Sequence, residues 1–127
     1  MILGLANATR VFAYGAPVDM RKGYDGLTAL VRDELGQDVL SGDLFLFVNK
    51  RRRRAKVLHF DGSGLCLYAK RLDKGQFACL WCDENKRNIE LSAAELSLFL
   101  AGCELIGSIA LTTPKLLPHE LAPPAAA

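Results

Sequence analysis

The chain has no apolar run approaching the about 18 to 20 residues that a membrane-spanning helix requires. Its first residues lack both the cationic start and the apolar stretch of a signal peptide, so we expect a cytoplasmic protein without a membrane partner. It has only two histidines, no glycine-rich P-loop, and acidic residues that are scattered over caps and turns. No nucleophile has a convincing partner base, and no acids have the spacing of a nuclease or transposase centre. We therefore predict no catalytic residue, no cofactor and no enzyme activity.

Cysteine is scarce, and the four present do not form a metal or disulfide pattern. Cys79 and Cys82 have the spacing of half a zinc site, but completing it with Cys103 and His119 would need a long, irregular spacing. A redox pair would instead open a helix in a βαβ unit, a context that this sequence does not predict. A domain of this size needs no disulfides, and Cys66 lies in an apolar alternation. We expect core or surface thiols and no metal.

Positive charge is concentrated in one fifth of the chain. Residues 50–74 carry nine lysines and arginines against two aspartates, a net charge of +7, whereas the remainder carries a net charge of −5. The overall net charge of +2 hides this asymmetry. Such a local block of cations is typical of a surface that meets a polyanion.

The first helix is predicted over about residues 20–35, where apolar residues recur at steps of three or four. Asp19 is its expected N-cap and Gly36 its expected stop. Two early glycines disfavour helix by roughly 1 kcal/mol each, so the helix could equally begin only after Gly26. These glycines also indicate a close backbone approach, either to a packed strand or to a phosphate. A second helix is predicted after Ser92, which forms a capping-box pattern with the following residues up to Glu95.

Strand character is found in segments rich in β-branched, aromatic and aliphatic residues. The segment 44–48 is uninterrupted in apolar residues, which is typical of a central strand covered on both faces. The glycine-rich residues 61–64 predict a tight turn between strands 55–60 and 65–72. The basic run 50–54 is then the turn between strands 44–48 and 55–60. The expected strands are residues 10–14, 44–48, 55–60 and 65–72, with residues 77–81 and 88–91 as possible fourth and fifth members of the meander.

The order strand, helix, antiparallel meander, helix predicts an α+β fold. We expect a single antiparallel β-meander sheet with two helices packed against one of its faces. The compact domain is predicted to cover residues 1–105, with a loose lead-in over residues 1–9. Residues 106–127 contain four prolines and an alanine-rich end, which predicts a disordered tail.

The five consecutive cations Lys50 to Arg54 contribute nothing to folding, because they repel one another at a turn. They are either a solvated, solubilising loop or the phosphate-contacting tip of a β-hairpin. A two-stranded ribbon also fits the major groove, so base contacts stay open. Arg21 and Lys22 would lie at a helix start that attracts anions, or Arg21 pairs with Asp19 or Asp25. The predicted nucleic-acid-binding residues are Arg21, Lys22, Lys50, Arg51, Arg52, Arg53, Arg54, Lys56, Lys70, Arg71 and Lys74.

Two long segments resemble a known family. They are the run from Asp19 to Leu27 (DMRKGYDGL) and the block from Asp61 to Leu72 (DGSGLCLYAKRL), and shorter matches lie between and around them. Over about residues 10–103 the chain resembles the small TnpB proteins encoded by the second open reading frame of IS66-type bacterial insertion sequences. The stretch from Cys79 to Asn85 departs from the family pattern, and the tail after Cys103 is longer than expected.

The resemblance implies a non-catalytic accessory factor that accompanies a separate transposase, and it supplies no catalytic residues. DNA and the transposase of the same element are the expected partners. Two hypotheses follow for the basic residues. Either the hairpin binds DNA, or the chain is a protein-interaction module that docks on the transposase without direct DNA contact. A third hypothesis is a metal- or redox-dependent enzyme built on Cys79 and Cys82.

Overall fold

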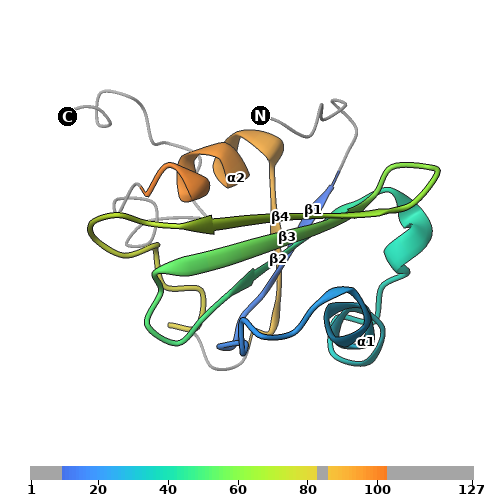
Figure 1. Ribbon diagram of the computed structural model, residues 1–127, viewed down its shortest axis with the longest axis horizontal. Helices are drawn as coiled ribbons and strands as arrows, with labels where there is room; N and C mark the ends of the chain where they lie inside the picture. Colours follow the sequence, from blue (N-terminus) through green and yellow to red (C-terminus); the bar gives the residue numbers. More distant parts are fainter. Residues whose placement is uncertain (1–9, 83–85, 103–127) are drawn as a thin grey trace.

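The computed structural model describes residues 10–82 and 86–102, which form one five-stranded sheet between two helices (Figure 1). Within this part of the chain, no helix is both long and apolar enough to cross a membrane. The elements in chain order are β1 (Val11–Tyr14), α1 (Tyr24–Asp33), the short 3-10 helix η1 (Val39–Ser41), β2 (Leu44–Val48), β3 (Arg54–Phe60), β4 (Leu65–Arg71), β5 (Asn88–Leu91) and α2 (Ala93–Leu100).

The strands lie in the order β4-β3-β2-β1-β5. β2, β3 and β4 form the predicted antiparallel meander, but β1 runs parallel to β2 and pairs with β5 on its other side. The prediction of an entirely antiparallel meander was therefore wrong for β1. The reason is the connection through α1, because only a crossover can bring two consecutive strands side by side in parallel.

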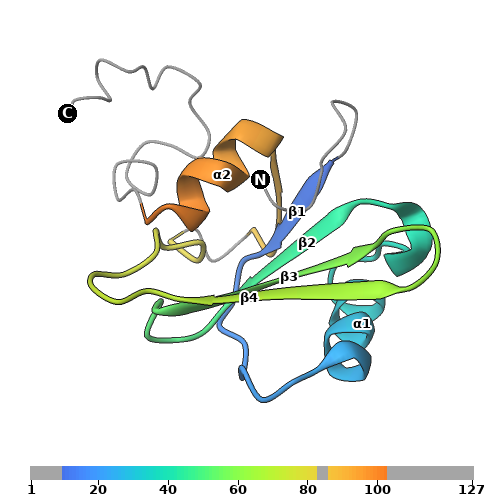
Figure 2. The same ribbon diagram turned by 45° about the horizontal axis from the view of Figure 1, so that its top comes forward.

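The two helices cover opposite faces of the sheet (Figure 2). Residues of β1, β2 and β3 alternate between two cores: Phe12, Phe45 and Leu58 pack with α1, whereas Val11, Leu44 and Val57 pack with α2. The expectation of both helices on one face was wrong. The physical reason is visible in β1 and β2, whose residues are all buried, so that both of their faces need a cover.

The first helix begins at Tyr24 with Gly23 as N-cap, between the two predicted starts at about residue 20 and after Gly26. Asp19 caps no helix, because its carboxylate accepts from the backbone N–H of Arg21 at 2.9 Å in the loop before α1. Gly36 ends the helical segment as predicted, with a φ of +64° that few other residues adopt. The capping box of α2 is confirmed: Ser92 N–H donates to the Glu95 carboxylate, and Glu95 N–H donates to the Ser92 hydroxyl.

The segment predicted as a strand at residues 77–81 is irregular. Its apolar character has another cause, since Phe77 is fully buried and its ring stacks on Phe99 of α2 with 5.2 Å between ring centroids. Among the described residues, one backbone hydrogen bond ties it to the sheet region, from the Phe77 N–H to the Arg52 carbonyl. The lead-in 1–9 and the tail 106–127 lie outside the described residues.

Candidate nucleic-acid interface

The structure brings together the two sequence segments that carry most of the motif information, the loop 18–22 and the basic turn. Lys56, in β3, donates from its ammonium to the carbonyls of Met20 at 2.8 Å and Lys22 at 2.9 Å. The backbone N–H of Val18 donates to the carbonyl of Val48 at the end of β2. Lys56 is thus a structural anchor for this loop as well as a cation.

The basic turn has a defined shape that depends on Asn49. The side-chain oxygen of Asn49 accepts from the backbone N–H groups of Arg53 at 2.9 Å and Arg54 at 3.0 Å. Its carbonyl accepts from the N–H of Arg52, which adopts a positive φ of 58°. A non-glycine residue in this left-handed region is uncommon and persists only where neighbouring contacts hold it. The hydrogen bonds to Asn49 hold the turn in this conformation.

Two of the five consecutive cations are used within the fold. Arg52 donates to the Phe77 carbonyl at 3.1 Å and to the Gln76 side chain at 3.3 Å, and Arg53 donates to the Asp73 carbonyl at 3.3 Å. These bonds lay the turn against the segment that follows β4. The turn is therefore flanked by other chain and is no free two-stranded ribbon, which disfavours insertion into a major groove.

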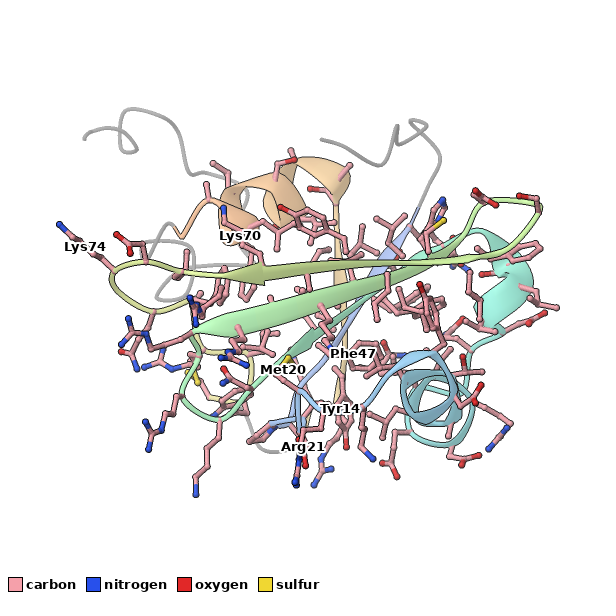
Figure 3. All side chains as sticks on the ribbon, in the orientation of Figure 1. Tyr14, Met20, Arg21, Phe47, Lys70 and Lys74 are labelled. Carbon is pink, nitrogen blue, oxygen red and sulfur yellow. The ribbon has the colours of Figure 1, made fainter. Side chains whose placement is uncertain are left out.

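The pleat of the sheet separates Lys70 from the other predicted cations. Lys70 pairs with Ala55 in register and so points to the α2 face, where its ammonium donates to the Leu100 carbonyl at 2.7 Å. Figure 3 shows Lys70 on the side of α2, with Met20 and Arg21 on the opposite side of the sheet. A cation at this place stabilises the carboxyl end of α2.

Arg54 and Arg71 lie directly opposite each other on the adjacent strands β3 and β4, and both are exposed. Three adjoining surface hollows, of about 410, 430 and 340 Å³, all have Arg54 in their lining. We call this surface the basic corner. Its cationic lining consists of Arg21, Lys50, Arg51, Arg53, Arg54, Lys56, Lys70 and Arg71. Lys70 lines one of the three hollows although its ammonium is bonded on the α2 face.

Several of these cations make no side-chain bond within the described residues, 10–82 and 86–102. Two like charges directly opposite on neighbouring strands destabilise a sheet, so Arg54 and Arg71 are costly without an anion. Figure 3 shows Lys74 at the tip of the loop after β4, away from the sheet. Among the predicted nucleic-acid-binding residues, those whose side chains make no hydrogen bond or ion pair in this part of the chain are Lys22, Lys50, Arg51, Arg54, Arg71 and Lys74.

Arg21 forms an ion pair with Asp19, two residues before it. Its guanidinium pairs with both oxygens of Asp19, the shortest contact being 2.7 Å, and this lowers the pKa of Asp19 to about 2. The sequence left open whether Arg21 pairs with Asp19 or with Asp25, and the structure shows the pair with Asp19. A Cβ on Gly26 would lie 3.2 Å from the side chain of Lys22. The close approach predicted for Gly26 is therefore to the Lys22 side chain and not to a strand.

The cysteines in the described part of the chain belong to no group of three potential metal ligands. The pKa of the Cys82 thiol is raised, mainly by its hydrogen bond with Cys79 and to a smaller extent by burial. A raised pKa keeps that thiol protonated, whereas thiolate chemistry requires the opposite. Cys103 and His119 lie outside the described residues.

Sequence reasoning missed the uncharged residues that build the basic corner. Met20 and Ala69 line the hollow of about 410 Å³, and Asn49 lines the other two hollows. Asn49 had a usable signal, because an Asn directly before a polar run is a frequent turn former. Met20 and Ala69 had none, since one was counted as part of a helix stripe and the other as an ordinary strand residue.

Comparison with known proteins identifies the family. The chain matches the profile of the IS66 Orf2-like proteins over residues 9–108. It is 35% identical over 103 residues to the uncharacterized protein y4jC of Sinorhizobium fredii, covering 81% of this chain and 86% of that protein. It is 37% identical over 95 residues to the uncharacterized protein y4hO of the same organism, covering 75% and 81%. No solved structure matches it. The chain therefore belongs to the family of IS66 Orf2-like proteins, which are associated with transposition of an insertion sequence.

Proposed function

We propose that this protein is a non-catalytic accessory factor of transposition that binds DNA phosphates through the basic corner. The observation that carries the proposal is the cross-strand pair Arg54 and Arg71, which together line two of the three hollows. In the described residues no carboxylate pairs with either guanidinium, and a phosphate between them would replace their repulsion by two charge-assisted bonds.

The contact is expected to go to the DNA backbone. The basic turn lies against the segment after β4 through Arg52 and Arg53, so it presents a surface and no projecting finger. Contacts to phosphates position a protein on DNA and carry no sequence information by themselves. The principal contacts are therefore assigned to Lys50, Arg51, Arg54 and Arg71, with Lys22 and Lys74 at the periphery.

The test compares two charge-matched variants by fluorescence anisotropy across a salt series. Arg54→Gln/Arg71→Gln removes two positive charges from the basic corner, and Arg10→Gln/Arg32→Gln removes two elsewhere. Each lost phosphate contact lowers the salt slope of log affinity by about 0.9, so the first variant should lose about 1.8 and the control nothing. Equal slopes in the two variants would contradict the proposal.

The duplex titration and a co-purification experiment together separate the two expected partners. An element-end duplex and a scrambled duplex of equal length should bind with similar affinity if backbone contacts dominate. Docking on the transposase is the alternative use of the same cations. Docking would be favoured if no duplex binds at low salt while the transposase still co-purifies with this protein from nuclease-treated, high-salt extract.

A further inference from the structure

The two edges of the sheet differ in how they are protected. β5 is an edge of four residues that contains the charged Glu90, whereas β4 is an edge of seven residues with the apolar run Leu65 to Ala69. The β3–β4 register is unbroken from Arg54–Arg71 to Phe60–Leu65, so no bulge interrupts it. Within residues 10–82 and 86–102, no strand lies beyond β4. Long, regular and apolar edges promote pairing with another chain.

The outward backbone groups of β4 follow from the hydrogen bonds at the two ends of the hairpin. Asp61 N–H donates to the Gly64 carbonyl at one end, and Leu72 N–H donates to the Arg53 carbonyl at the other. Because bonded and non-bonded pairs alternate in an antiparallel ladder, every second residue of β4 bonds to β3. The residues whose N–H and C=O point away from the sheet are Leu65, Leu67, Ala69 and Arg71.

We propose that β4 pairs with β4 of a second copy of this chain, in antiparallel orientation, to form a continuous ten-stranded sheet. With Tyr68 opposite Tyr68 of the second copy, every outward group of β4 meets its complement. This register sets Leu67 against Ala69 and Leu65 against Arg71, so that no like charges are opposed. A parallel arrangement would instead set the cationic ends of the two strands side by side, which is unfavourable.

Charge also favours a second copy as the occupant of this edge. The antiparallel register directs Lys74, which follows β4, toward the turn that begins with Asp61 in the other copy. Asp61 is exposed, and backbone and side-chain bonds from Ser63 hold its pKa at about 2, so it is ionised. The basic end of β4 thus meets the acidic end of its partner on both sides of the two-fold axis.

Pairing would also double the basic corner. A two-fold axis perpendicular to the sheet keeps both α1 faces on the same side of the dimer. Arg71 of one copy would then be six residues along the strands from Arg71 of the other, about 20 Å at 3.4 Å per residue. This inference does not depend on DNA binding, since it rests on backbone groups of β4.

The test is sedimentation velocity of the full chain from about 1 μM to 1 mM, a range that covers weak and strong dimers. Ala69→Pro removes one outward N–H from each copy while leaving the bonds to β3, as prolines on edge strands do. It should weaken the dimer at least about tenfold, because two interface hydrogen bonds are lost. Ala69→Ser keeps the N–H and should dimerise as the wild type does. A monomeric wild type, or a dimer that Ala69→Pro leaves equally tight, would overturn the proposal.

Amide hydrogen exchange of the wild type decides the matter if Ala69→Pro does not fold. In the dimer, the N–H groups of Leu67 and Ala69 are bonded and should exchange more slowly as the protein concentration rises. The N–H groups of Cys66 and Tyr68 bond within the monomer, so they serve as internal references. Exchange of Leu67 and Ala69 that is fast at every concentration would exclude pairing through this edge.

Discussion

Lys56 joins the two segments that form the basic corner, so its removal tests how that surface is held. Lys56→Met keeps the apolar stem of the side chain and removes the ammonium. Two bonds are lost, to the carbonyls of Met20 and Lys22, and the first of these is partly buried. A hydrogen bond to a charged group contributes about 1.5 to 3 kcal/mol, and the more exposed bond contributes less. We therefore expect the free energy of unfolding to fall by about 2 to 3 kcal/mol.

The assay is urea and thermal unfolding followed by circular dichroism. A loss of this size lowers the Tm by about 10 °C for a domain of this length. Lys50→Met is the matched control, because its ammonium makes no bond within the described residues, and it should change stability by less than about 0.5 kcal/mol. If Lys56→Met and Lys50→Met destabilise equally, the two bonds do not anchor the loop, and the reasoning is refuted.

Two further predictions concern the backbone and the acid range. Gly15→Ala should destabilise by about 3 kcal/mol in urea unfolding, because its Cβ would collide with the Lys86 carbonyl oxygen, whereas Gly64→Ala meets open space and should stay within about 0.5 kcal/mol. The lowered pKa of Asp61, about 2, means that its ionised form stabilises the fold above its unfolded pKa and loses this effect as pH falls toward 2. Asp61→Asn should therefore flatten the fall of Tm between pH 4 and 2, and an unchanged profile would contradict this role.

The sequence was sufficient where local physics decides. The apolar run 44–48 became the central strand β2, the glycine turn joined β3 to β4, and the capping box opened α2. The charge block was also readable, because net charge over a window does not depend on the fold. It identified a region of the surface but could not say which of its cations are free.

Local signals misled where burial comes from distant contacts. Residues 77–81 have a strand-like composition because Phe77 fills the core against α2, and no strand pairing is involved. Asp19 is a good helix cap by type, but its guanidinium partner Arg21 lies two residues later and holds it in a loop. The two-faced burial of β1 was hidden, since four residues are too few to show a pattern.

The sequence by itself determined the α+β class, the basic block and the family, because composition, turn chemistry and long motifs are properties of the chain alone. Tertiary structure decided which cations share a surface. The pleat sent Lys70 to the α2 face and set Arg54 against Arg71 on the other. Strand order alone made β4 an edge, and the hydrogen-bond phase of the β3–β4 ladder decided which of its backbone groups point outward.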